Sequence, residues 1–341
     1  MSDLDLLVVG GGPAGLATAL HAARAGLDVE VWEQRPGVVD KACGEGLMPG
    51  AVAALDDLGV RTVGQDLTGI RYLDDRRCVA APFRAGPGRG VRRTVLHEAL
   101  RDAVAAAGVP VRHRSAERLV QKADTADVDG TTAAYVVAAD GLHSPLRRAL
   151  GLDARRPAVS RFVLRAHFAT APWTSYVEVH WSPRAEAYVT PVAPDLVGVA
   201  VLTAERGSFA EHLRRFPTLR EQVGEPAGEV LGAGPLRQRA RSRVAGRVLL
   251  VGDAGGYVDA LTGEGVALAV AQARAAVAAI VDRQPERYER DWHEVTRRYR
   301  WLTAGLLGAT RVPPVRRALV PAAERLPGVF AAAVNSLARP A

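Results

Sequence analysis

Cysteine is nearly absent from the sequence, and so are long apolar runs. The 341 residues include two cysteines, Cys43 and Cys78, which excludes a scaffold held together by several disulfide bonds. No apolar run approaches the roughly 20 residues that a membrane-spanning helix needs. The longest candidate, residues 302–309, could at most lie on a membrane surface or on a partner protein. No signal peptide precedes the first apolar run, which starts at Leu4, so we expect a cytoplasmic protein.

Lysine is as scarce as cysteine, although the chain is basic. Only Lys41 and Lys122 are lysines, so 42 of the 44 positively charged side chains are arginines, and the formal net charge is +7. The arginines are scattered rather than gathered on one stripe, which argues against a nucleic-acid partner. Hydrophobic residues make up 48% of the chain and charged residues 24%. This composition excludes a disordered or fibrous protein and predicts a globular one.

The N-terminal segment predicts a strand, a turn, a helix and a second strand. Residues 4–9 form an apolar run typical of a buried strand, and residues 10–15 are a glycine-rich turn. A helix is expected over 16–25 and another buried strand over 29–32. Strands connected through a helix lie parallel in a sheet. Helical spacing of apolar residues predicts a further helix over 94–107.

A second pattern, with a period of two, runs through residues 160–203 and predicts an antiparallel sheet. The all-apolar strand pattern returns at 247–251, and an Ala/Val-rich helix is expected over 265–281. The first domain is therefore discontinuous, with the sheet inserted into it. Past residue 286 the sequence becomes Arg-rich helix interrupted by prolines, which predicts short helices packed over the body.

We therefore predict an α/β protein with three parts. The first is a three-layer, Rossmann-like domain that binds a dinucleotide, the second an inserted antiparallel sheet that binds substrate, and the third a helical cover at the C-terminus. Their expected limits are 1–70, 90–157 and 240–285 for the dinucleotide-binding domain, 71–89 and 158–239 for the sheet, and 286–341 for the cover.

The glycine-rich turn carries the first chemical signal. Residues 10–15 read G-G-G-P-A-G and fit the pattern G-x-G-x-x-G between a strand and a helix. Glycines at these positions let the backbone approach a pyrophosphate, which then sits at the positive end of the helix. Glu33 ends the next strand, where a carboxylate can accept hydrogen bonds from both ribose hydroxyls. The same carboxylate would repel a 2′-phosphate, so NADP is disfavoured at this turn.

A second motif, Gly-Asp at the end of a later strand, distinguishes FAD from NAD. Residues 248–254 read V-L-L-V-G-D-A, a buried strand ending in Gly252 and Asp253. A second strand of this kind, far along the chain from the glycine turn, suits a cofactor too long for one glycine loop. We therefore expect FAD.

Four separated motifs resemble the FAD-dependent oxidoreductases built on the para-hydroxybenzoate hydroxylase plan, and within them most closely the geranylgeranyl reductase family. The motifs span residues 10–265 and specify the superfamily better than any one reaction. They are residues 10–15 with Glu33, the R-x-x-L-x-x-x-L segment that starts at Arg93, the D-G-x-x-S-x-x-R segment at 140–147, and G-D-A-G-G at 252–256.

The resemblance implies roles for single residues. Glu33 would hold the adenosine ribose, Arg93 would lie near the FAD phosphates or ribityl chain, and Asp253 would bind the ribityl hydroxyls. Asp140 and Gly141 would pack beside the pyrophosphate and pair their turn with Arg147. A solvated helix charge or a structural ion pair remains the alternative for the two arginines. The cofactor-binding residues predicted in all are Gly10, Gly12, Pro13, Ala14, Gly15, Glu33, Arg35, Cys43, Gly44, Arg93, Asp140, Gly141, Gly252, Asp253, Gly263, Glu264 and Gly265.

Two loops resemble the reductase group in particular. Residues 41–49, K-A-C-G-E-G-L-M-P, are similar to its Cys-Gly-x-Gly loop, and residues 258–265, V-D-A-L-T-G-E-G, to its Asp-Pro-Leu-Thr-Gly-Glu-Gly loop. Gly263 and Gly265 would open a helix whose N-terminus stabilises an anionic reduced flavin. Ala260 replaces the expected proline, and of the family's Tyr-x-Trp-x-Phe-Pro signature only residues 188–191, Y-V-T-P, remain. Both departures affect the substrate side.

Cys43 and Tyr188 are the predicted catalytic residues. A thiol beside a flavin could relay protons or position substrate, although a buried cysteine is more often a small apolar side chain. Neither a Ser-His-Asp arrangement nor metal-ligand spacing appears, and none is needed where a cofactor carries the electrons. The inserted sheet supplies further candidates for the substrate pocket, for each of which a structural role is the simpler alternative: His167, Tyr176, His180, Trp181 and Tyr188.

The leading prediction is an FAD-dependent oxidoreductase that reduces a C=C bond of a largely apolar small molecule, such as an isoprenoid. NAD(P)H or another reductant would supply the electrons. A monooxygenase that epoxidises or hydroxylates through a peroxyflavin stays open, and so does a flavin-binding protein without turnover. The Trp-x-Trp-x-Ile-Pro motif of halogenases does not occur. The sequence does not predict the oligomeric state.

Overall fold

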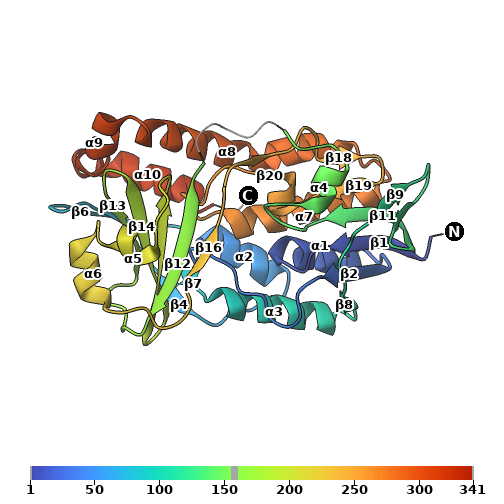
Figure 1. The fold of residues 1–341 in the computed structure, drawn as a ribbon, viewed down its shortest axis with the longest axis horizontal. Coiled ribbons are helices and arrows are strands. Elements are labelled where there is room, and N and C mark those ends of the chain that lie inside the picture. Colours follow the sequence, from blue (N-terminus) through green and yellow to red (C-terminus); the bar gives the residue numbers. More distant parts are fainter. Residues whose placement is uncertain (1, 155–159, 340–341) are drawn as a thin grey trace.

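A mainly parallel sheet organises the first body of the molecule (Figure 1). The computed structural model describes residues 2–154 and 160–339. The four strands in the middle of this sheet are mainly apolar. This is expected because both faces of the sheet are covered. The strands run in the order β18 (Val244–Ala245), β19 (Val248–Leu250), β11 (Thr131–Ala138), β1 (Leu4–Val9), β2 (Val29–Glu33) and β8 (Val111–His113), and the hairpin β9 (Leu119–Gln121) and β10 (Ala126–Val128) adds to β11.

Three helices pack on one face of this sheet and enclose the largest core cluster. They are α1 (Pro13–Arg24), α3 (Arg93–Ala106) and α7 (Gly265–Val281). The predicted strands and helices are present, with shifted ends. Helix α1 begins at Pro13, three residues before the predicted start, because proline is favoured in the first turn of a helix, where its missing N–H is not needed.

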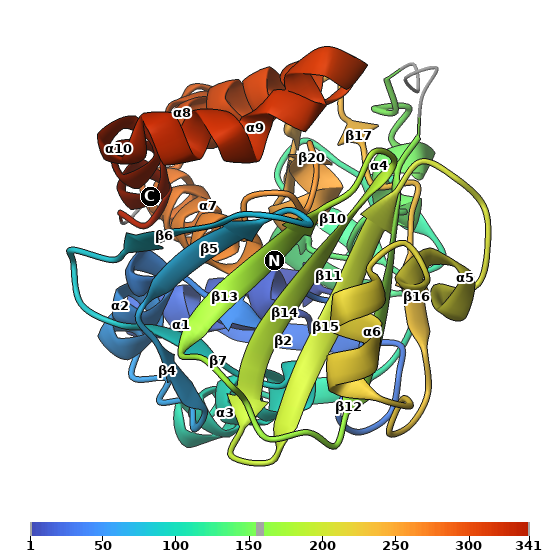
Figure 2. The same cartoon turned by 90° about the vertical axis from the view of Figure 1, so that its left-hand side faces the viewer.

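The second sheet faces the first body across the molecule (Figure 2). Helices α5 (Phe209–Leu213) and α6 (Pro217–Val223) cover its outer face. The antiparallel pairing predicted for residues 160–203 is confirmed, and one further pair, β13 with β5 from an earlier segment of the chain, runs parallel. The strand order is β16 (Leu231–Ala233), β12 (Phe162–Phe168), β15 (Leu196–Thr203), β14 (Ala185–Ala193), β13 (Tyr176–Trp181), β5 (Gly69–Leu73) and β6 (Cys78–Pro82).

Short elements connect the two bodies. Strands β3 (Gly46–Leu47), β7 (Gly88–Gly90) and β4 (Gln65–Leu67) make a small sheet of their own, and β17 (Gln238–Arg239) pairs with β20 (Gly256–Tyr257). The remaining short elements are α2 (Pro49–Asp57), α4 (Pro145–Ala149) and the 3₁₀ turn η1 (Gly252–Gly255). The exact domain limits given above stay a prediction.

Helices α8 (Arg287–Thr310), α9 (Pro313–Arg325) and α10 (Pro327–Leu337) form the C-terminal cover (Figure 2). Residues 302–309 lie within α8, where Thr303 and Leu307 are buried against the body. Trp301, just before this stretch, is 79% exposed. Every helix in the described part of the chain is too short or too polar to cross a membrane. Contact of this stretch with a membrane surface stays a prediction.

Candidate active site

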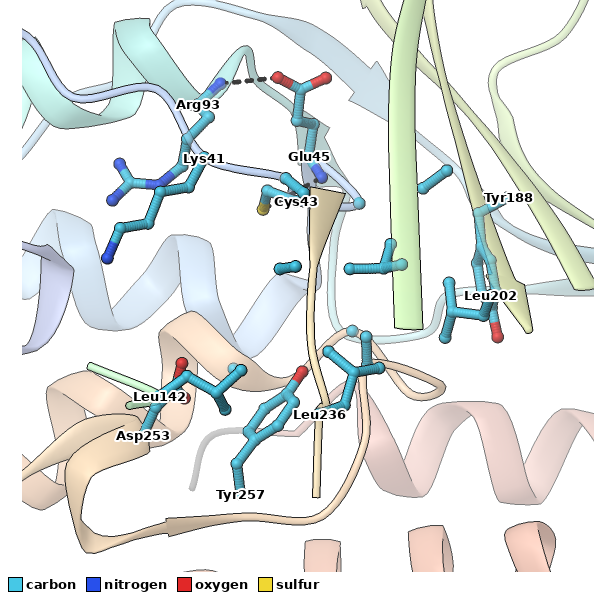
Figure 3. A pocket seen from close by; sticks show the side chains of 18 of the residues that line it. Lys41, Cys43, Glu45, Arg93, Leu142, Tyr188, Leu202, Leu236, Asp253 and Tyr257 are labelled. Carbon is cyan, nitrogen blue, oxygen red and sulfur yellow. Dashed lines mark hydrogen bonds between the residues drawn. The ribbon is translucent and has the colours of Figure 1, made fainter. Parts of the chain in front are cut away.

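A cavity of about 1070 Å³ lies between the two sheets and receives side chains from both (Figure 3). Its volume is slightly above the range of about 300–1000 Å³ that small-molecule sites usually have. Most of the predicted site residues line it, although they come from distant parts of the chain. Those that do are Gly12, Pro13, Ala14, Arg35, Cys43, Gly44, Arg93, Asp140, Gly141, Tyr188, Gly252, Asp253, Gly263 and Gly265.

Gly10 and Gly15 do not line the cavity, but they shape the turn that does. A Cβ on Gly15 would lie 1.8 Å from the carbonyl oxygen of Gly10. Gly10 has a φ of +111°, and a Cβ there would lie 2.3 Å from the carbonyl oxygen of Ala139. At Gly12, by contrast, no described atom lies within 4 Å of such a Cβ. The first and last glycines therefore allow close packing of the turn, whereas the middle one leaves open space at the start of α1.

Glu33 lies behind the glycine turn. Its Oε2 accepts a hydrogen bond from the Gly11 amide at 2.8 Å, and its Oε1 accepts from the Arg35 amide at 3.0 Å and from Arg35 Nε at 3.1 Å. Burial alone would raise the pKa of Glu33, but these donors lower it below its ordinary value. The carboxylate is therefore charged and held behind the glycine turn, and its contact with an adenosine ribose stays a prediction.

The Gly-Asp motif at residues 252–253 packs directly against the glycine turn. Gly252 has a φ of +67°, and a Cβ on it would lie 2.7 Å from Cβ of Ala14. Asp253 projects into the cavity (Figure 3). Burial raises the pKa of Asp253, while Lys41 and Arg147 act to lower it. Lys41 lines the same region, and burial together with Arg35 lowers its pKa.

Arg93 supplies the clearest sign of an anionic ligand. It is buried and lines the cavity, yet none of the described residues lies within hydrogen-bonding distance of its Nη1. A buried guanidinium nitrogen without a partner is costly, and a phosphate oxygen is the kind of acceptor that would satisfy it. With the open space at Gly12, this unpaired donor shows that the residues present fit a dinucleotide such as FAD.

Of the roles considered for Arg147 in the sequence analysis, the structure supports a structural ion pair. Its Nε donates to Asp153 Oδ1 at 2.6 Å, and its Nη1 donates to the Ala254 carbonyl at 3.0 Å. Only 2% of its surface is exposed. Asp140 accepts from the Leu146 amide at 3.0 Å through Oδ2, while no described residue bonds its buried Oδ1. Arg147 thus fixes the 140–147 turn against the Gly-Asp turn.

A buried chain of polar contacts around Glu45 escaped the sequence analysis. Glu45 Oε1 accepts from the Arg93 amide at 2.9 Å, and His167 Nε2 lies 2.7 Å from Glu45 Oε2. Arg165 Nη1 donates to His167 Nδ1 at 3.0 Å and Arg165 Nη2 donates to Asp40 at 2.5 Å. Because Nδ1 accepts, the ring proton is on Nε2 and is donated to Glu45.

Glu45 itself is unusually placed. Its φ is +58°, in the left-handed region that few residues other than glycine adopt. A Cβ placed on Gly198 would lie 2.7 Å from Oε2 of Glu45. Because that distance is too short, β15 must carry glycine at this position. Two features of the sequence could have indicated this network: the position of Glu45 between two glycines of the 41–49 loop, and the presence of a histidine on β12.

Cys43 lies in the same loop and lines the cavity. Its Sγ accepts a hydrogen bond from the Glu45 amide at 3.4 Å. Burial, and then the charge of Glu45, raises the pKa of the thiol. The side chain is therefore a neutral thiol rather than a thiolate at neutral pH. Its catalytic role stays a prediction.

Of the five candidates on the second sheet, only Tyr188 lines the cavity. Its hydroxyl donates to the Leu261 carbonyl at 2.8 Å, and its catalytic role stays a prediction. His167 holds Glu45, as described above. The other three have structural contacts: Tyr176 lies under Arg71, His180 lies 3.3 Å from Glu178, and Trp181 packs edge-on against Tyr72.

The N-terminus of α7 closes the cavity beside the Gly-Asp turn. Gly263 and Gly265 line it, whereas Glu264 does not. Glu264 is buried, and burial raises its pKa to about 7. Asp259 is buried at 3.7 Å from Arg161, and burial raises its pKa to about 6. These two carboxyl groups lie behind the loop rather than on its inner surface.

Comparison with known proteins identifies the class. The FAD-binding domain family matches residues 3–283, and the chain belongs to this family. Menaquinone reductase of Mycolicibacterium smegmatis is 34% identical over 302 residues, covering 77% of this chain and 72% of that protein. Digeranylgeranylglycerophospholipid reductase 1 of Methanothermobacter thermautotrophicus is 27% identical over 298 residues, covering 78% and 74%.

Solved structures share the fold. A geranylgeranyl bacteriochlorophyll reductase-like protein from Thermoplasma acidophilum matches with a TM-score of 0.80 at 20% identity, covering 93% of this chain and 90% of that one. The flavin-dependent brominase Bmp2 matches with a TM-score of 0.79 at 17% identity, covering 98% and 93%. The predicted fold and cofactor are confirmed, and the protein is an FAD-dependent oxidoreductase.

Proposed function

We propose that the protein reduces a C=C bond in the side chain of an isoprenoid lipid, with a polyprenyl quinone such as menaquinone as the first substrate to test. One observation carries the proposal: the cavity that the cofactor motifs line is also lined by aliphatic side chains from the second sheet and from the segment before β17, a part of its lining that we call the apolar lobe. A lobe of this kind suits a prenyl chain and offers few partners to a polar ring. The names of the two reductase relatives above point to the same substrate class. The residues of this lobe include Ile70, Val163, Val177, Val179, Leu202 and Leu236.

The chain's own residues would hold the cofactor at one end of this space. Arg93 and Lys41 provide positive charge for the phosphates, and Asp253 provides a carboxylate for the ribityl hydroxyls. The N-terminus of α7 at Gly265 places backbone N–H groups, which favour negative charge, beside the cavity. Bound FAD would supply the hydride chemistry. The apolar lobe excludes water from the reacting double bond.

Reduced holoprotein mixed with menaquinone under argon tests the proposal. The expected product carries two additional hydrogen atoms in its side chain, as read by mass spectrometry. The same reaction under ¹⁸O₂ tests the monooxygenase alternative, in which the product gains a labelled oxygen atom. Incorporation of ¹⁸O would contradict the reductase proposal, and a flavin that no reductant bleaches would favour binding without turnover.

NAD(P)H is the proposed electron donor, used transiently. Because Glu33 is the proposed ribose-binding acid at the glycine turn, a 2′-phosphorylated nucleotide would have to approach elsewhere. The cytoplasm is the proposed location.

A further inference from the structure

Three tyrosines line the cavity, and their hydroxyl groups are in different situations. Tyr188 donates to the Leu261 carbonyl at 2.8 Å. The hydroxyls of Tyr72 and Tyr257 have no hydrogen-bonding partner among residues 2–154 and 160–339. The rings of Tyr72 and Trp181 are 5.3 Å apart, and that of Phe330 in α10 is 4.6 Å from Tyr72. Tyr72 therefore belongs to the end of the lobe beneath the C-terminal cover.

Tyr257 lies at the opposite, cofactor end of the lobe. It follows the turn η1 that carries Asp253, and β20 pairs its backbone with Gln238 of β17. Gln238 Nε2 donates to the Pro235 carbonyl at 2.8 Å, which helps to fix the short β17–β20 ladder. In Figure 3 the ring rises from β20 with its hydroxyl directed into the cavity, between Asp253 and Leu236 in that view.

The surroundings of Tyr257 keep its hydroxyl protonated. Burial raises its pKa well above the ordinary value of 10, and Tyr299, Asp253, Asp259 and Cys43 raise it further. Cys43 also carries a proton, but a thiol is a weaker hydrogen-bond donor than a hydroxyl. Tyr257 is the accessible O–H donor nearest in sequence to the Gly-Asp turn.

We propose that Tyr257 is a catalytic residue whose hydroxyl protonates the substrate double bond, an inference that rests on the proposed reduction of a C=C bond. One alkene carbon would take a hydride from the reduced flavin while the other takes the proton of the Tyr257 O–H group. The π electron pair of the alkene forms the new C–H bond to that proton. The phenolate left behind recovers a proton from water, so atoms and charge balance.

Tyr257→Phe removes the hydroxyl group, and with it the proposed proton donor, while keeping the aromatic ring. The variant is expected to keep full FAD content and to be bleached by dithionite as wild type is. Reoxidation of its reduced flavin by menaquinone under argon is expected to slow by about 10²- to 10⁴-fold, the usual contribution of a positioned proton donor. In D₂O the wild-type product should gain deuterium at the carbon that receives the proton and, because the N5–H of a reduced flavin exchanges with solvent, also at the carbon that receives the hydride.

Tyr176→Phe is the matched control, because Tyr176 is on the second sheet but outside the cavity. Its rate should stay within about twofold of wild type. If Tyr257→Phe reduces menaquinone as fast as wild type does, the role of Tyr257 is refuted and the proposed function stands. If wild type itself leaves the side chain unreduced, the proposed function fails, and this inference fails with it.

Discussion

His167 Nε2 and Glu45 Oε2 lie 2.7 Å apart, although 122 positions separate the two residues in the chain. This contact connects β12 of the second sheet to the loop that carries Cys43. The other oxygen of Glu45 accepts the Arg93 amide at the start of α3. One buried carboxylate therefore holds the second sheet, the cysteine loop and the cavity-lining Arg93 in a single arrangement.

Glu45→Gln is expected to destabilise the protein although it preserves shape. The amide has one acceptor, so in either orientation its NH₂ group faces a second donor, the Arg93 amide or His167 Nε2. The cost should be about 1–3 kcal/mol in the free energy of unfolding, the usual range for a buried donor left without an acceptor. Thermal unfolding of the holoprotein measures it. Glu221→Gln, at an exposed glutamate on α6, is the control, and equal melting temperatures for the two variants would contradict the role of Glu45.

Arg93→Met is expected to weaken FAD binding. A hydrogen bond to a charged group contributes about 1.5–3 kcal/mol, which corresponds to about 10- to 100-fold in Kd. Quenching of FAD fluorescence by the apoprotein measures this affinity. Arg76→Met removes an exposed arginine of the β5–β6 turn and should leave the affinity unchanged. Wild-type affinity in Arg93→Met would mean that the unpaired guanidinium nitrogen faces no ligand group.

The scarcity of lysine allows a direct test of the cofactor position. Lys41 lines the cavity, whereas Lys122 is exposed directly after β9. Acetylation of the apoprotein with acetic anhydride should modify both side chains. With FAD bound, peptide mass spectrometry should find Lys41 protected and Lys122 modified as before. Equal modification of Lys41 with and without FAD would show that the cofactor lies elsewhere.

Glu264 predicts a specific dependence of stability on pH. Burial raises its pKa from 4.5 to about 7, so the folded state binds a proton more tightly than the unfolded state does. Stability is therefore lost as pH rises from about 4.5 to about 7. The loss is at most about 3 kcal/mol by the pKa difference. Glu264→Gln should raise the melting temperature relative to wild type more at pH 8 than at pH 5, and an equal difference at both pH values would contradict the raised pKa.

Local patterns in the sequence predicted the cofactor side of the fold. The strand–turn–helix at residues 4–24 depends on neighbouring residues. Gly10 and Gly15 are required by backbone atoms within 3 Å of a Cβ placed there, and Gly252 by the Cβ of Ala14 at 2.7 Å. The parallel pairing of β13 with β5 was missed because it joins segments more than a hundred residues apart. The contact between Glu45 and His167 was missed for the same reason, because it depends on how two bodies pack, which periodicity does not encode.

The substrate side was the least predictable part. His180, Trp181 and Tyr176 were reasonable candidates because aromatic and imidazole groups often line pockets, yet alternation along a strand does not say which face meets the cavity. Tyr257 was not singled out, since a tyrosine directly after a glycine pair has no motif of its own.

The most direct test compares two menaquinones as oxidants of the reduced holoprotein under argon. One has a fully unsaturated prenyl chain and the other has the same quinone ring with a fully saturated chain. The account predicts that stopped-flow absorbance shows rapid return of the oxidised flavin band with the first and none with the second. Equal reoxidation by both would show that electrons go to the quinone ring, and it would contradict reduction of a side-chain double bond.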